Sequence, residues 1–263
     1  MSAPSGFEPR GDPRRLEAFS LNAWPSLQTV VDDGWIVRFA EGFTKRANSV
    51  NPLYPGSEPL ARKIDRCEAR YARAGLATVF KISPAVDPPS LDAALAERGY
   101  AREAETQVLT HASLAAAPAA HAPAVIADRP TPTWVDRAAH MNGISPARRE
   151  ILGRLLGNIL PPRAFAALER ERQLLAVGLG VVEGGWLGLF DLVVDPAFRR
   201  QHLGRELVLN LLEWGRSLGA ERAYLQVAVE NEAARRLYTT LGFEESYRYW
   251  YRVRPAPVPA RGA

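Results

Sequence analysis

The sequence predicts an α/β (α+β) fold, in which a mixed, mostly antiparallel twisted sheet is flanked by helices. A second, smaller α/β domain is expected at the N-terminus. Three apolar segments joined by short polar turns are typical of consecutive antiparallel strands: Ala164–Leu168, Leu174–Val182 and Trp186–Val194. An Ala/Pro-rich stretch in the middle of the chain separates them from an earlier alternation of strand-like and helix-like segments.

The composition indicates a folded chain with substantial cores, because 47% of its 263 residues are hydrophobic. The single cysteine, Cys67, excludes an internal disulfide framework. Apolar runs stay well below the roughly 18 residues of a membrane span, and Met1–Arg15 lacks the hydrophobic region of a secretory signal. We therefore expect a cytoplasmic protein without membrane contact.

The net charge of +4 comes from arginine, because Lys45, Lys63 and Lys81 are the only lysines. An arginine excess fits either a compositional bias or a preference for phosphate. Basic runs with interleaved aromatic residues do not occur, so no nucleic-acid partner is expected. His111 and His121 lie in the Ala/Pro-rich stretch without acidic neighbours, and no metal site is expected.

The first half alternates strand and helix signals and is expected to form a domain over 13–110. A linker over 111–123 and a second domain over 124–255 complete the expected organisation. The expected elements of the first half are a helix from Pro13, strands at Thr29–Val31 and Trp35–Phe39 around the turn Asp32–Gly34, a helix over Leu60–Arg73, a strand over Ala77–Ile82, a helix capped by Ser90 and a strand over Glu105–Thr110.

A polar cluster in the first half, Lys45, Arg46, Asn48 and Ser49, has two interpretations. It forms either an anion or substrate site, or a turn in which Asn and Ser side chains bond the backbone.

The second half begins with a strand near Val125 and helices over Thr131–His140 and from Ser145 to Ile159. The segment Gly178-Leu179-Gly180 lacks both the third glycine and the following helix of a dinucleotide-binding motif. A Gly-Lys-Ser/Thr phosphate loop and a Gly-x-Ser-x-Gly nucleophile elbow are also missing from the sequence.

An anion site is predicted where the strand ending at Val194 leads into the next helix. That helix carries Leu207, Leu211, Trp214 and Leu218 on one face. Its start near Leu203–Arg205 presents unpaired backbone N–H groups and the positive end of the helix dipole. Gly204 lets a ligand approach the backbone, and three arginines surround this end, namely Arg199, Arg200 and Arg205. The arrangement suits a phosphate or pyrophosphate.

The following strand, Ala223–Val229, leads to a helix that starts near Asn231. Asn231, Ala234 and Tyr238 share one face of this helix. They either cap and pack the helix, or place an amide and a phenol in a cleft.

These two segments resemble the GNAT superfamily of N-acetyltransferases. The superfamily signature Q/R-x-x-G-x-G/A corresponds to Arg199, His202 and Gly204, preceded by Val194 and Pro196. A second signature, V-x-x-x-N-x-x-A-x-x-L-Y-x-x-x-G-F, is met at every spacing by Val227, Asn231, Ala234, Leu237, Tyr238, Gly242 and Phe243. His202 departs from the pattern because it stands where the superfamily has its first glycine. The first half resembles a degenerate GNAT-like domain.

The resemblance implies a GNAT-like sheet that splits between the strands ending at Val194 and Val229, with acetyl-coenzyme A bound in the split as co-substrate. Tyr238 would protonate the departing thiolate, while Asp191 or a water relay would take the proton of the amine. No metal is implied. The implied coenzyme-binding residues are Leu192, Val193, Val194, Arg199, Arg200, Gln201, His202, Leu203, Gly204, Arg205, Asn231, Ala234 and Tyr238.

The implied function is transfer of an acetyl group from acetyl-coenzyme A to a primary amine of a small molecule or protein. The alternative is a non-catalytic sensor that binds acyl-coenzyme A, which His202 keeps open. The acceptor amine and the choice between monomer and homodimer stay open. The C-terminal aromatic residues Tyr247, Tyr249, Trp250 and Tyr251 either border the acceptor site or, because they alternate as in a strand pair, belong to a core or an interface.

Overall fold

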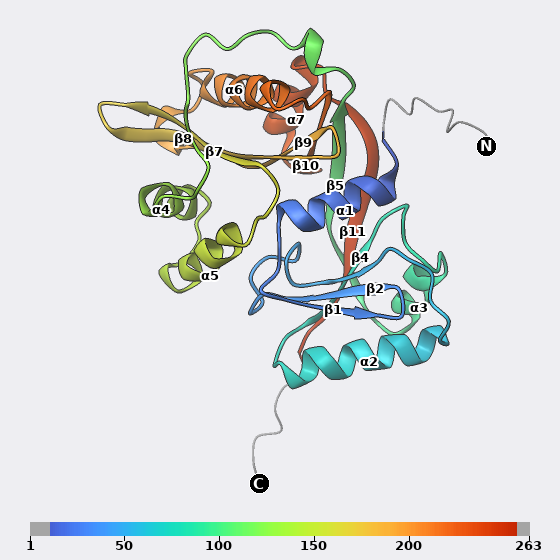
Figure 1. The fold of residues 1–263 in the computed structure, drawn as a ribbon. Helices are drawn as coiled ribbons and strands as arrows, with labels where there is room; N and C mark the ends of the chain where they lie inside the picture. Colours follow the sequence, from blue (N-terminus) through green and yellow to red (C-terminus); the bar gives the residue numbers. More distant parts are fainter. Residues whose placement is uncertain (1–10, 257–263) are drawn as a thin grey trace, which may run out of the picture.

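The computed structural model describes residues 11–256, which form one twisted eleven-stranded sheet covered by helices (Figure 1). The strand order is β1-β2-β3-β4-β11-β5-β10-β9-β8-β7-β6. Within the described residues only β3–β4 and β9–β10 pair in parallel, so the predicted mixed, mostly antiparallel fold is confirmed. In the same residues no helix has the length and apolar character needed to cross a membrane.

The first half contains three helices and five strands, most of them close to the predicted ranges. They are α1 (Pro13–Ala23), β1 (Gln28–Asp32), β2 (Trp35–Phe39), β3 (Val50–Pro52), α2 (Leu60–Arg73), β4 (Thr78–Ile82), α3 (Leu91–Glu97) and β5 (Ala101–His111). β3 was not predicted, because its three residues end in a proline and carry no alternation. β5 is longer than predicted, because its first four residues are exposed.

The second half repeats the element order of the first, so that β7-β8-β9-α6-β10-α7-β11 corresponds to β1-β2-β3-α2-β4-α3-β5. Its elements are β6 (Val125–Ala127), α4 (Pro132–Met141), α5 (Pro146–Gly157), β7 (Arg163–Arg170), β8 (Gln173–Glu183), β9 (Trp186–Val194), α6 (Leu203–Ser217), β10 (Arg222–Ala228), α7 (Glu232–Thr240) and β11 (Glu244–Arg254). In each half, three antiparallel strands lead through a helix into a strand that is parallel to the third, and a further helix leads into a last long strand.

The last strands of the two halves are exchanged. β5, from the first half, pairs with β10 of the second half, whereas β11, from the second half, pairs with β4 of the first half. β5 and β11 also pair with each other at the centre of the sheet. The two halves therefore share one hydrogen-bonded sheet.

The faces of the second half are covered by different helices (Figure 1). Phe165, Val177 and Leu179 pack on one face with residues of α4 and α5, while Ala164, Ala166 and Ala176 pack on the other with α6. The glycines that resemble a dinucleotide motif have a packing role: a Cβ on Gly178 would lie 3.1 Å from Leu207 Cδ2, and one on Gly180 would lie 3.0 Å from Leu211 Cδ2. Glycine thus permits close approach of α6 to β8.

A buried ion pair of the first half lies beneath α1, and a tyrosine of the second half bonds to it. Lys81 Nζ in β4 lies 2.5 Å from Glu17 Oε2 in α1, and both side chains are at most 5% exposed. The Tyr247 hydroxyl in β11 donates a hydrogen bond to Glu17 Oε1 at 2.9 Å. Lys81 Nζ also lies 3.8 Å from the centroid of the Tyr249 ring.

Replacing Lys81 by methionine is expected to lower the free energy of unfolding by about 3–5 kcal/mol, because the carboxylate of Glu17 stays buried without its counter-charge. Denaturant unfolding measures this loss. The control is Arg236→Met, which removes an exposed ion pair to Glu232 and is expected to cost less than about 1 kcal/mol. Equal losses in the two variants would contradict the prediction.

Candidate active site

The parallel strands β9 and β10 pair only over their first residues and then separate. Their ladder runs from Trp186↔Arg222 to Leu189↔Leu225, and the later residues of the two strands are not paired with each other. The cause lies on the other side of β9, where the register with β8 shifts between Val177 and Leu179. Such a bulge inserts an extra residue and bends its strand. The sheet is therefore split between the ends of β9 and β10, at the place where a split was expected.

Asp191 lies in this bulge with a left-handed backbone, φ 46°. Its Oδ2 atom is inaccessible to solvent and has no hydrogen-bond partner within residues 11–256. Burial raises the pKa of the Asp191 carboxyl above its usual range, and the positive charge of Arg46 opposes part of that shift. A carboxylate with a raised pKa and a free oxygen has the properties of a general base.

The start of α6 has the features expected of an anion site. Its N-cap residue, His202, has φ 59°, and no side chain caps the helix. The positive φ explains why glycine is favoured at this position, since only a minority of other residues adopt it. The His202 side chain is exposed. A Cβ on Gly204 would lie 3.3 Å from Leu237 Cδ2, so even a methyl group would crowd the contact with α7.

The arginines around this helix start differ in availability. Arg199 and Arg200 are exposed and take part in no ion pair within the described part of the chain. Arg205 is held by Glu206, with 3.1 Å between Arg205 Nη1 and Glu206 Oε1. Arg199 and Arg200 are therefore better placed than Arg205 to meet an incoming anion.

The corresponding place in the first half is filled by the chain's own carboxylate. Asp33 accepts hydrogen bonds from the backbone N–H groups of Ser57, at 2.8 Å, and Glu58, at 3.0 Å, just before α2. Lys63 Nζ lies 3.1 Å from Asp33 Oδ2. The backbone hydrogen bonds, with Lys63, hold the pKa of the Asp33 carboxyl well below its usual range, so it is ionised. The Asp33 carboxylate thus occupies, at the start of α2, the place equivalent to the one that stays open at the start of α6.

The remaining predicted residues lie on both sides of the split. Leu192, Val193 and Val194 form the half-buried end of β9, and Gln201 is exposed before α6. Leu192, Val194, Leu203 and Ala234 pack on the α6 side of the sheet. Asn231 caps α7 by accepting a hydrogen bond from the backbone N–H of Ala234 at 3.2 Å. Its capping role is therefore present, and its side-chain amide nitrogen stays available.

Tyr238 lies in α7 and is 7% exposed. Its ring makes an edge contact with Phe243 at 6.1 Å between centroids. Burial raises the pKa of Tyr238 to about 12, and its hydroxyl has no hydrogen-bond partner in the described residues. The phenol is therefore protonated at neutral pH and free to donate.

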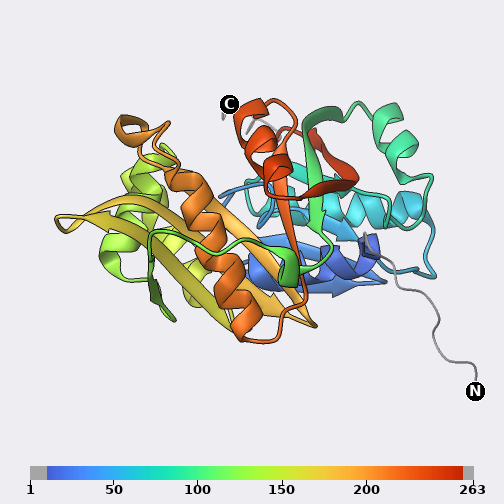
Figure 2. The ribbon, with the colours of Figure 1, turned by 90° about the horizontal axis from the view of Figure 1, so that it is seen from above.

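The segment predicted as a linker is fastened to α6. Glu206 Oε2 accepts hydrogen bonds from the backbone N–H groups of His121 and Ala122, at 2.6 and 3.1 Å, and Asn210 Oδ1 accepts one from Ala124 at 2.8 Å. Figure 2 shows this segment crossing beside α6. His111 lies in β5 and is buried. The low-complexity sequence gives no signal for this docking.

A cavity of about 530 Å³ opens beside Asp191. Both halves line it: Trp24, Phe43, Thr44 and Arg46 come from the first half, and Asn142, Gly143, Ile144, Ser145, Arg148 and Asp191 come from the second. Of the polar cluster in the first half, only Arg46 lines this cavity. Asn48 Oδ1 instead accepts hydrogen bonds from the backbone N–H groups of Ala40 and Gly42, as in the backbone-bonding interpretation.

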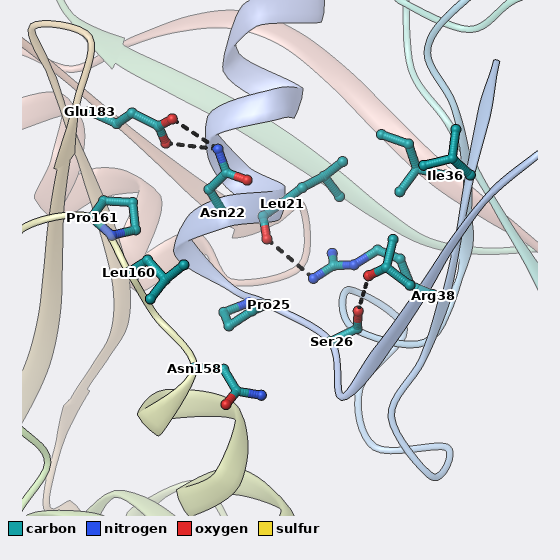
Figure 3. A pocket seen from close by; sticks show the side chains of 12 residues that line it. Leu21, Asn22, Pro25, Ser26, Ile36, Arg38, Asn158, Leu160, Pro161 and Glu183 are labelled. Carbon is teal, nitrogen blue, oxygen red and sulfur yellow. Dashed lines mark hydrogen bonds between the residues drawn. The ribbon is translucent and has the colours of Figure 1, made fainter.

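A second cavity, of about 690 Å³, lies between α1, β2 and the segment after α5 (Figure 3). Its charged groups are already paired. Asn22 donates to Glu183 at 2.9 Å, and Arg38 donates to the backbone oxygens of Arg46, Leu21 and Trp24. Because these groups are satisfied internally, this cavity offers less recognition chemistry than the one at Asp191.

Residues 11–252 match a family model described as "Probable histone acetyltransferase Rv0428c C-terminal". The chain is 30% identical over 247 residues to an uncharacterized N-acetyltransferase, YobR, of Bacillus subtilis, covering 92% of this chain and 99% of that protein. It is 28% identical to the probable histone acetyltransferase Rv0428c of Mycobacterium tuberculosis, covering 88% of this chain and 70% of that protein.

Among solved structures, a GCN5-related N-acetyltransferase from Kribbella flavida has a similar fold. The TM-score is 0.68, at 16% sequence identity, over 94% of this chain and 97% of that chain.

Proposed function

Because the chain belongs to the Rv0428c C-terminal acetyltransferase family, within the GNAT superfamily, we propose that it transfers an acetyl group from acetyl-coenzyme A to a primary amine. The observation that carries the proposal is the bulge of β9, which splits the sheet and places the unpaired Asp191 carboxylate beside a cavity. The donor would enter the split, and the amine would enter the cavity.

In this proposal the start of α6 holds the pyrophosphate of the donor. The uncapped N–H groups and the helix dipole favour an anion there, and Gly204 has no side chain to keep it away. Arg199 and Arg200 add two unpaired positive charges. Backbone N–H groups at Val193 or Val194, at the end of β9, would polarise the thioester carbonyl, as in an oxyanion hole.

The chemical step follows from the two acid–base groups. Asp191 takes a proton from the ammonium form of the acceptor, and the neutral nitrogen attacks the thioester carbon. A C–N bond forms and the C–S bond breaks. Tyr238 gives its proton to the sulfur, and the second proton of the attacking nitrogen passes through solvent to the Tyr238 phenolate, so that free thiol and neutral amide leave. Asp191 then releases its proton to solvent. Proton transfers of this kind contribute about 10²–10⁴-fold each.

The test is thiol release by the purified protein with acetyl-coenzyme A and a panel of amines, together with calorimetric titration of the coenzyme. Binding with thiol release that depends on an amine supports the proposal. Binding without release on any amine favours a sensor, the alternative suggested by the exposed His202 at the donor site. A lack of coenzyme binding contradicts both functions.

Replacing Arg199 by glutamine is expected to raise the KM for acetyl-coenzyme A by about three- to tenfold with little change in kcat, because one charge-assisted phosphate contact is lost. Steady-state kinetics at saturating amine measure this shift. The matched control is Arg216→Gln, at the opposite end of α6, which should leave the KM unchanged. A similar shift in both variants would point to general electrostatics instead of a contact.

A further inference from the structure

The cavity beside Asp191 is bounded by both halves of the chain, and its charges are unusual. Arg46, from the loop after β2, and Arg148, in the first turn of α5, both line it. Neither arginine side chain forms an ion pair or hydrogen bond with another residue over 11–256. Arg46 is positioned by Trp24, whose ring centroid lies 5.0 Å from the guanidinium carbon. The cavity therefore presents two guanidinium groups without a direct ion pair, of which Arg46 also acts electrostatically on Asp191.

Asp191 supplies the opposite charge in the same cavity. Its buried Oδ2 lacks a partner within the described residues, and a buried carboxylate without a partner is costly. A ligand ammonium would satisfy it. Two guanidinium groups and one carboxylate thus complement a ligand that carries an ammonium and an anionic group, since planar guanidinium groups match a carboxylate with paired hydrogen bonds.

The charges of Arg46 and Arg148 disfavour a lysine-rich peptide as the acceptor. Beyond the amine that reaches Asp191, further positive charges of such a peptide would face Arg46 and Arg148. Like charges brought together in a partly desolvated cavity oppose binding.

We propose that the acceptor is a small amine that also carries a carboxylate, an amino-acid-like molecule, with its ammonium at Asp191 and its carboxylate between Arg46 and Arg148. This assignment rests on the proposed N-acetyltransferase function. It also gives the first half of the chain a defined role. Asp191 comes from the second half, and Arg46 of the first half adds selectivity for the acceptor.

The experiment compares amino acids with the amines that lack only the carboxylate, such as phenylalanine with phenethylamine and lysine with cadaverine. A lysine-rich peptide is included. We expect the kcat/KM measured by thiol release to favour the carboxylated member of the accepted pair by about tenfold or more, the scale of a hydrogen bond to a charged group. Equal values within each pair, or a preference for the peptide, would overturn the assignment.

Arg46→Gln and Arg148→Gln are each expected to reduce this preference by about tenfold, through a higher KM for the carboxylated amine. Arg149→Gln is the matched control, because Arg149 follows Arg148 in α5, pairs with Asp136 at 3.0 Å and does not line the cavity. A preference that persists in both Arg46→Gln and Arg148→Gln would remove the arginines from acceptor recognition.

Calorimetric titration with N-acetyl amino acids, the expected products, separates this assignment from the proposed reaction because it needs no turnover. Binding to the wild type that is lost in Arg46→Gln and kept in Arg149→Gln supports the carboxylate site even where thiol release is absent. Thiol release from simple amines without any binding of N-acetyl amino acids would overturn the assignment and leave the transferase function standing.

Discussion

Asp191→Asn is expected to lower kcat by about 10²–10⁴-fold, because the amide cannot take the proton of the acceptor. Asparagine has nearly the same shape and tolerates the left-handed backbone at this position, φ 46° in the native chain. The bulge and the cavity should therefore persist. Steady-state thiol release measures the loss, and calorimetry with acetyl-coenzyme A checks that the donor site is intact.

The pH profile of the same variant adds a second measurement. Burial raises the pKa of Asp191, and the carboxyl must lose its proton before it can act as a base. The kcat/KM of the wild type should rise as the pH increases through that raised pKa, and this rise should be missing in Asp191→Asn. Asp136→Asn, which changes an exposed carboxylate in α4, is expected to keep the wild-type profile.

Stability should change in the opposite direction. An acid whose pKa is higher in the folded state binds more protons there than in the unfolded chain, so folding becomes less favourable as the pH rises through that window. Above that raised pKa the ionised Asp191 thus weakens the fold. Asp191→Asn removes this penalty and is expected to raise the melting temperature. Lower activity together with lower stability would indicate a structural role for the carboxylate.

Tyr238→Phe is expected to lower kcat by about tenfold or more, with little change in coenzyme binding, because only the hydroxyl that protonates the thiolate is removed. The ring stays and keeps its edge contact with Phe243. The pKa of about 12 keeps the phenol protonated over the working pH range, as an acid requires. Thiol release at saturating substrates measures the loss, and calorimetry measures binding.

Tyr54→Phe is the control for this variant, since Tyr54 is an exposed tyrosine of the first half, far along the chain from α7. It should leave kcat unchanged. Unchanged turnover in purified Tyr238→Phe would remove Tyr238 from the mechanism, and its packing in the core beside Phe243 would then account for the residue.

Local patterns were sufficient to predict most of the elements. The bounds of α2 and β9 agree with the predicted ranges, because an apolar stripe at helical spacing and a strand between turn residues are local signals. The exchange of β5 and β11 between the halves was not predicted. The pattern of a strand determines which face is buried but not which strand lies beside it. The neighbour is therefore determined by the packing of the whole sheet.

The candidate site likewise has a part that could be predicted from the sequence and a part that could not. The uncapped start of α6 was predicted from Arg199, His202 and Gly204, which adjoin in sequence, and Asp191 was selected as the acid nearest the expected split. Arg46 belongs to the polar cluster for which an anion or substrate site was one of two interpretations. Its combination with Arg148 in one cavity was not predicted, because the two arginines come from different halves and come together only in the folded chain.

The exchange of the last strands also determines how the molecule should unfold. Pulling one half away would break the ladders β5–β10, β11–β4 and β5–β11 together, and would expose the edges of the strands left behind. Melting should therefore be a single cooperative transition for the whole chain, with no stable intermediate in which one half survives alone. A cavity walled by both halves then keeps its shape for as long as the protein is folded at all.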